Sequence, residues 1–251
     1  MPNWCSNALG VTGPAEDISK FVESIKELDE SSESEWDICR PYPLPKVLEG
    51  TRAPRPTMEQ VDRLRNLDPE VQPILARNWT QDAEIQDLLD KIAQADKAEK
   101  ETGYADWYTW TNAHWGTKWS PDVTQASIEL TAVSLTFDSA WSPPQGLVVE
   151  LSRINPALTF ILEYAEPGTG YLGASAYRKG EEVVMSYINC VEDDDPLMKS
   201  LNDAIRAVYK AEEMGEEFNP NLEGDLQDRI NERWMQLQER AGADVAEALT
   251  V

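Results

Sequence analysis

The sequence of 251 residues predicts an α+β fold, and three observations carry this prediction. Short stretches alternate between apolar and polar residues, which is typical of half-buried strands. Between them lie stretches with apolar residues three or four positions apart, which is typical of amphipathic helices. The strands and helices follow one another as two β-α-β halves, and a hairpin extends the second half. This order describes an antiparallel sandwich of the ferredoxin-like, or split βαβ, type.

The first half of the core is expected in residues 1–45. Residues 7–11 alternate and end at Thr12-Gly13-Pro14, which predicts a strand and then a helix with Pro14 at its first position. One helix face is formed by Ile18, Phe21, Val22, Ile25 and Leu28. Residues 34–39 could form a second strand, which the alternating prolines of 41–45 would end.

The second half of the core is expected in residues 104–190. An aromatic helix through residue 113 precedes two alternating stretches of opposite phase, which predicts one long strand with a bulge near Ala132. The segment from Ser142 to Gln145 resembles a capping box, with Ser142 as the cap of a helix that ends near residue 155. Strands are expected at 158–165, 171–177 and 183–188.

Two regions lie outside this core. Residues 46–103 contain short amphipathic stretches and little aromatic content, which predicts a helical insertion. Residues 191–251 predict an acidic extension of two helices with apolar stripes. The first stripe is formed by Leu197, Leu201, Ile205 and Val208, and the second by Leu222, Leu226, Ile230, Trp234 and Leu237.

Composition limits the class of protein. The formal net charge is −24, and residues 192–251 contain 16 acidic against six basic residues. Such a chain repels nucleic acid and anionic membranes, so its expected partners are basic proteins, or none. No apolar run is long enough to cross a membrane and no signal peptide is visible, so the cytoplasm is the expected location. The three cysteines are widely spaced, and we expect buried free thiols without a metal or cofactor.

Tryptophan-containing motifs give a resemblance to a known family. These are Pro2-Asn3-Trp4-Cys5-Ser6-Asn7, the segment from Trp115 to Trp119, and the segment from Phe137 to Pro144. In this order they resemble the YubB-type ferredoxin-like domain proteins of phages and conjugative plasmids. Residues 164–173 look like that family's closing hairpin. The resemblance implies a mobile-element origin and the same fold, and it implies no established activity.

The tryptophans of these motifs are expected to be structural. We expect Trp4, Trp115, Trp119 and Trp141 to be mostly buried where the helices cross the sheet. Replacing Trp141 by alanine would then cost about 3–5 kcal/mol. Lys118 is expected to cover an indole face as a cation–π contact.

No residue set indicates catalysis. His114 is the only histidine and is expected to be packed or solvent-facing rather than catalytic, although a pair with Cys5 or Cys39 is not excluded. Residues 192–195 lack the alternation of a calcium loop. Gly168 to Gly173 match a dinucleotide-binding pattern, but strands are expected on both sides, which indicates a hairpin. The sequence therefore predicts a protein that is not an enzyme.

The expected role is that of a phage or plasmid accessory protein. It would bind a host protein, such as a DNA-handling or defence enzyme, for host takeover or anti-defence. An acidic surface that imitates DNA is one variant of this hypothesis, and its candidate residues are Glu192, Asp193, Asp194, Asp195, Glu212, Glu213, Glu216 and Glu217. The alternative is a small-ligand or nucleotide-binding protein or enzyme with a cleft at the 164–173 hairpin.

Overall fold

The computed structural model describes residues 3–27, 34–66, 80–189 and 220–250, with short pieces at 195–197, 199–200 and 203–204. The chain forms two compact units. The first consists of Met1–Tyr42 and Ser120–Val251, and the second of Pro43–Trp119. The second unit is thus inserted into the first, and it continues through Trp119 rather than ending at residue 103.

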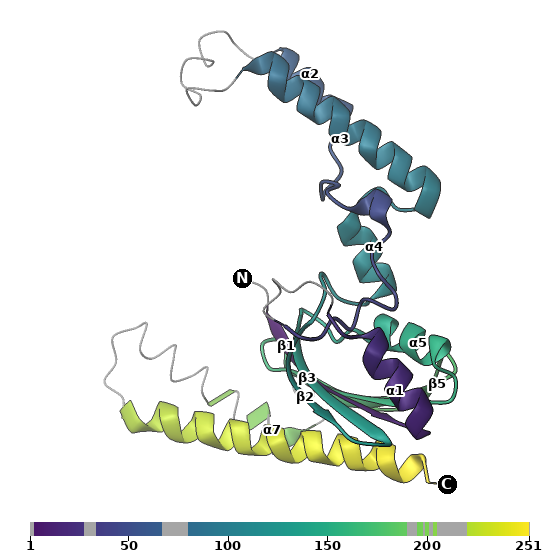
Figure 1. Cartoon of the computed structure of the whole chain (residues 1–251). Helices are drawn as coiled ribbons and strands as arrows, with labels where there is room; N and C mark the ends of the chain where they lie inside the picture. The colour runs from purple at the N-terminus through teal and green to yellow at the C-terminus, as the bar shows by residue number, and fades with distance from the viewer. Residues whose placement is uncertain are drawn as a thin grey trace. The chain divides into compact units, whose positions relative to one another are not determined.

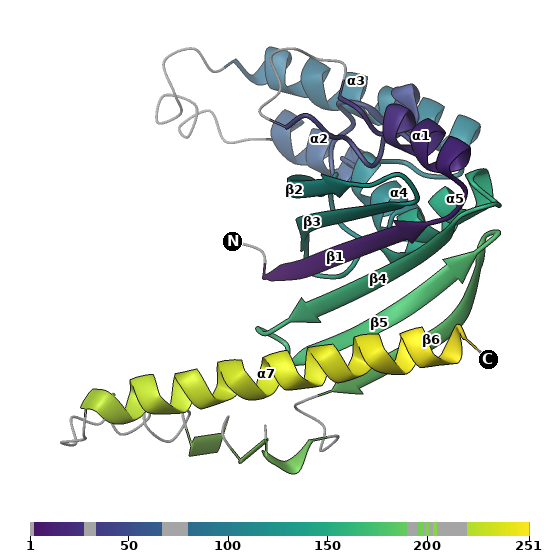
Figure 2. The same cartoon turned by 60° about the horizontal axis from the view of Figure 1, so that its bottom comes forward.

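The first unit is built on a six-stranded sheet with the order β2-β3-β1-β4-β5-β6 (Figure 2). All neighbouring strands are antiparallel. The strands are β1 (Trp4–Thr12), β2 (Asp122–Ile128), β3 (Ala132–Ala140), β4 (Thr159–Glu166), β5 (Tyr171–Arg178) and β6 (Glu181–Asn189). The order of the first four is that of a split βαβ fold, so the predicted ferredoxin-like α+β class is confirmed.

Two helices cover one face of this sheet, α1 (Ala15–Ser24) and α5 (Gln145–Ile154) (Figure 1). Alternate residues of β1 are buried beneath them, namely Cys5, Asn7, Leu9 and Val11. Phe21 of α1 meets Phe160 of β4 edge to face, with 5.4 Å between the ring centroids. The alternation read from the sequence therefore places the core between these helices and the sheet.

Helix α7 (Pro220–Ala248) covers the opposite face over β4, β5 and β6. Its buried residues Leu237, Ala241 and Val245 recur every four positions and pack on small side chains of β5. The stripe predicted from Leu226 to Leu237 is confirmed in α7. Most of the preceding stripe, from Leu201 to Val208, lies outside the described residues, as does Leu222 as a side chain.

Three local predictions are wrong. The expected bulged strand is a hairpin of β2 and β3, closed by a hydrogen bond from the Glu129 amide to the Ala132 carbonyl at 2.8 Å. Leu130 is exposed in this turn, so the alternation of Ile128, Leu130 and Ala132 does not mark one continuous strand. Residues 34–39 form turns and a single bridge between Lys26 and Trp36, because Asp37 accepts a hydrogen bond from the Cys39 amide. Ser142 does not cap α5, since that helix begins at Gln145 without a side-chain cap.

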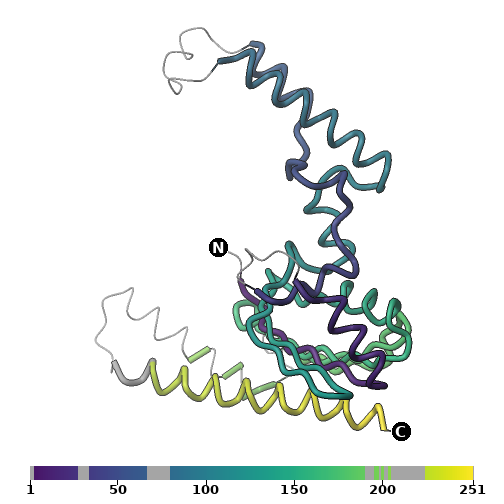
Figure 3. Tube along the Cα trace, viewed as in Figure 1, coloured from purple at the N-terminus to yellow at the C-terminus, as the bar shows by residue number. Residues whose placement is uncertain are grey.

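The second unit contains η1 (Lys46–Leu48), α2 (Met58–Arg65), α3 (Gln81–Thr102) and α4 (Trp107–His114). Helices α2 and α3 lie side by side (Figure 3). Thr80 caps α3 through a hydrogen bond from the Ala83 amide, and Gly103 ends it with φ 83°. Among the described helices of both units, none combines the length and apolar character needed to span a membrane.

Candidate binding surface

Three of the sequence motifs meet at one end of the sheet of the first unit. The Trp141 amide donates a hydrogen bond to the Asn3 carbonyl at 2.9 Å. The Asn3 side chain lies against Gly168, where a Cβ atom would come within 2.6 Å of Asn3 Nδ2. A side chain at position 168 would displace the side chain of Asn3 or Glu166, so glycine permits this close approach. The start of β1, the end of β3 and the β4–β5 turn are thereby held together.

A buried polar pair fixes the strands beneath this junction. Asn7 Nδ2 donates hydrogen bonds to the Cys5 carbonyl at 2.7 Å and to Ser139 Oγ at 2.9 Å. Ser139 Oγ in turn donates to the Ser142 carbonyl at 2.7 Å. Both side chains are buried, and their hydrogen bonds tie β1 to β3 and to the turn that follows β3. These bonds rigidify the turn that carries Trp141.

Trp4 and Trp141 lie on the outside of this junction. Their exposed fractions are 47% and 50%, so the prediction that they are mostly buried is wrong. Trp4 lies at the first position of β1, on the face opposite to Cys5 and therefore away from α1 and α5. Trp141 follows the last residue of β3 and has φ 72°, the left-handed region that non-glycine residues rarely occupy. We call the two exposed indoles the Trp4–Trp141 surface.

Glu166 has a structural role in the β4–β5 hairpin. Its carboxylate accepts hydrogen bonds from the amides of Gly168 at 2.9 Å and Thr169 at 2.6 Å, and from the Thr169 hydroxyl. The side chain is only 1% exposed. Strands flank the glycine-rich segment, so the expected hairpin is confirmed. The Glu166 carboxylate is thus held within the hairpin by its own turn.

The two described thiols, those of Cys5 and Cys39, are free and buried, as expected. Burial raises the pKa of Cys5 to about 12, and burial likewise raises the pKa of Cys39. His114 belongs to the second unit, where its ring stacks on Trp110 at 4.4 Å and meets Tyr104 at 5.2 Å. The expectation of a packed imidazole is confirmed. No group of side chains suited to a metal ion occurs among the described residues.

The aromatic motif of the second unit is only partly a core element. Trp115 is 5% exposed and meets Trp110 edge to face at 5.6 Å, in agreement with the predicted burial. Trp119 is half-buried, less than the prediction of a mostly buried indole. Lys118 Nζ lies 4.4 Å from the centroid of that ring, which confirms the predicted cation–π contact.

The structure contradicts one acidic partner-binding candidate. Asp195 is 5% exposed, and its two carboxylate oxygens accept hydrogen bonds from Arg233 Nε at 3.3 Å and Nη2 at 2.5 Å. It anchors the residues before α7 and is not presented to a partner. The other seven candidates, Glu192, Asp193, Asp194, Glu212, Glu213, Glu216 and Glu217, lie outside the described residues.

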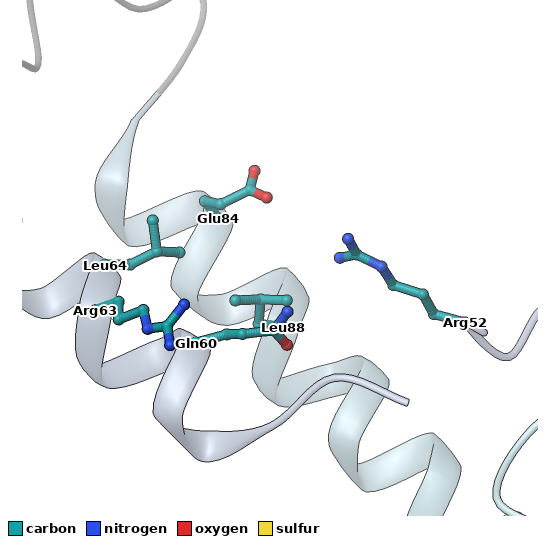
Figure 4. Close-up of a pocket in the computed structure, with 6 residues that line it drawn as sticks. All are labelled: Arg52, Gln60, Arg63, Leu64, Glu84 and Leu88. Carbon is teal, nitrogen blue, oxygen red and sulfur yellow. The ribbon is translucent and has the colours of Figure 1, made fainter. Parts of the chain in front are cut away.

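A shallow pocket of about 280 Å³ lies in the second unit, where α2 and α3 meet (Figure 4). Leu64 and Leu88 form its apolar side, and Arg52 points toward it from the loop before α2. Arg63 is held by Glu59 at 2.6 Å. No sequence motif marks this pocket, because its six lining residues come from three separate segments.

The fold and these geometries define the first unit as a ferredoxin-like α+β domain. A family model described as the ferredoxin-like domain in Api92-like protein matches residues 114–212. Among solved structures, the chain is similar to the crystal structure of protein api92 from Yersinia pseudotuberculosis. The two are 16% identical with a TM-score of 0.36, over 75% of this chain and 98% of that chain. No curated protein matches the chain. The resemblance to YubB-type proteins of phages and plasmids remains a prediction.

Proposed function

We propose that the first unit is a protein-binding module and that the Trp4–Trp141 surface is its contact site. The observation that carries this proposal is the pair of half-exposed indoles on a junction fixed by hydrogen bonds. Tryptophan is the residue type most enriched among the residues that dominate protein interfaces. Its large ring also loses little conformational entropy when it is already held in place.

Backbone strain at Trp141 supports a binding role. A non-glycine residue in the left-handed region costs about 1–2 kcal/mol. This cost persists because the Trp141 amide and carbonyl are both engaged, by the Asn3 carbonyl and the Tyr171 hydroxyl. If position 141 only had to form the turn, glycine would adopt this backbone conformation at a lower free energy. Such strain gathers at functional sites, where the surrounding structure maintains it.

The partner in this proposal is a host-cell protein, bound in the cytoplasm by a phage- or plasmid-encoded accessory protein for host takeover or anti-defence. The motif resemblance supports the mobile-element origin. The net charge of −24 favours a basic partner surface. The DNA-mimic variant is weaker, because Asp195 is paired with Arg233 inside the fold.

A capture experiment tests this function. Tagged full-length chain is incubated with host lysate, and bound proteins are quantified for wild type, Trp4→Ala and Trp141→Gly. Each variant should lose at least about tenfold in capture of a common partner, because a dominant aromatic contact contributes more than 1.4 kcal/mol. The control is Tyr108→Ala in the second unit, which also removes an exposed ring (41% exposed) and should leave capture unchanged.

Thermal unfolding of each variant shows that the fold is kept. Full capture by both folded tryptophan variants would overturn the proposed contact site. Addition of duplex DNA provides a further reading. Displacement of the partner by DNA would favour the DNA-mimic variant, and retention would exclude it.

A further inference from the structure

Strand β6 ends the sheet and carries an exposed apolar stripe. No strand pairs with its outer edge among the described residues. Val183, Met185 and Tyr187 occupy alternate positions on the face of α1 and α5 and are 47%, 55% and 48% exposed. The other face is covered, because Val184 and Ile188 pack in the cluster beneath α7. An open edge with three exposed apolar side chains is a surface suited to another strand.

We propose that β6 pairs with β6 of a second copy of this chain, antiparallel and centred on Met185. This alignment overlaps the whole strand, so that Glu181 faces Asn189 of the other copy. Val183 then faces Tyr187, and Met185 faces its own equivalent. The two stripes merge into one apolar surface, in which cross-strand pairs of this type are stabilising.

Charge is compatible with this alignment and specifies it. Glu181 and Glu182, the only charged residues of β6, face Asn189 and Ile188 rather than acids. Shifting the register toward the start of β6 would bring these acids of the two copies together, which is destabilising. The register with β5 shifts only at the beginning of β6, between the partners of Ala176 and Tyr177, so Val184–Asn189 remain regular.

The helix on the opposite face also permits the pairing. A two-fold axis perpendicular to the sheet keeps both α7 helices on the same face. Because α7 covers β4, β5 and β6 and is centred near β5, the two helices would be separated by about three strand spacings, or roughly 14 Å. Packed helices approach to about 8–10 Å, so the two copies do not collide.

The test is the mass of the full chain in solution at roughly 100 μM, by light scattering after size exclusion. Wild type should give twice 28.2 kDa. Met185→Lys and Met185→Glu should each be monomeric, because like charges then face each other across the axis. Mixing the two variants should restore the dimer through a Lys–Glu pair, and only in the mixture.

Leu130→Lys is the matched control, since Leu130 is exposed but lies in the β2–β3 turn and should leave the dimer intact. Circular dichroism verifies that each variant is folded. A monomeric wild type, or a dimer that both Met185 variants retain, overturns the proposal. The readout is independent of partner capture by the Trp4–Trp141 surface, so either proposal can fail without the other.

Discussion

The hydroxyl of Tyr171 donates a hydrogen bond to the main-chain carbonyl of Trp141 at 3.0 Å. Tyr171 begins β5, and Trp141 follows β3, so the bond joins two segments that are not neighbouring strands in the sheet. Burial raises the pKa of Tyr171 above its usual range, which keeps the hydroxyl protonated and able to donate. This single bond therefore links the strained turn to the hairpin extension.

Replacing Tyr171 by phenylalanine should weaken this link. The Trp141 carbonyl would lose its partner, and the expected loss is about 0.5–1.5 kcal/mol of unfolding free energy. Urea denaturation measures the effect, with Tyr108→Phe as a control whose exposed ring should show little change. Equal midpoints for wild type and Tyr171→Phe would show that the bond does not contribute.

Substitutions of Trp141 should separate strain from packing. Because half of the side chain is exposed, Trp141→Ala should cost about 2–3 kcal/mol, less than the 3–5 kcal/mol expected for a buried indole. Trp141→Gly should be more stable than Trp141→Ala by about 0.5–1 kcal/mol, since glycine adopts φ 72° without strain. The reverse order in thermal unfolding would contradict the role of backbone strain.

The pair of Asp195 and Arg233 should stabilise the attachment of α7. The Asp195 side chain is 7% exposed and that of Arg233 27%, so Asp195→Asn leaves a largely buried cation without its counter-ion. We expect a loss of about 1–3 kcal/mol in urea denaturation. Arg233→Gln should cost a similar amount, and the double variant should cost less than the sum of the two. Additive losses would show that the residues do not interact.

Stability should fall at alkaline pH. Burial raises the pKa of Cys5 from 9.0 to about 12 and that of Tyr164 from 10.0 to about 12. Both groups are neutral in the folded chain but ionise earlier when it unfolds. Their contribution is therefore complete below pH 9 and is lost as the pH rises toward 12. The slope is about 1.4 kcal/mol per pH unit for each ionised group.

Melting temperatures between about pH 8 and pH 11 measure this loss. Cys5→Ala should flatten the decline above pH 9, because one of the ionising groups is then absent. An identical pH profile for this variant would show that the Cys5 thiol is not held neutral by the fold.

Strands and helices with one buried face could be predicted from the sequence, because their apolar residues recur at the spacing of the element. The predictions of β1 and of the α7 stripe were correct because Leu9 and Val11 lie two positions apart, and Leu237 follows Ile230 and Trp234 at helical spacing. The hairpin turn near Glu129 was missed because alternation continues on both sides of it. Trp4 and Trp141 were misjudged because size and hydrophobicity predict burial, whereas exposure at a strand end depends on where the covering helices stop.

The Trp4–Trp141 surface could be predicted from the sequence only in part. Its motifs were recognised, but their meeting depends on contacts such as that between Asn7 and Ser139, which are 132 positions apart. The pairing of Asp195 with Arg233 is likewise a long-range contact, which no local pattern of charge indicates.

The central position of β1 has a consequence for the order of folding. β1 is the first strand in sequence, yet both of its partners, β3 and β4, come after the inserted unit, with Ser6 opposite Asp138 and Ala165. During synthesis, β1 stays unpaired until β3 and β4 have been made. Residues 43–119 precede both strands, and their helices contact segments close in sequence, so they can fold earlier. Closing such distant pairs is slow because the loop entropy is lost before the contacts are gained. We therefore expect the inserted helices to form before β1 pairs with β3 and β4.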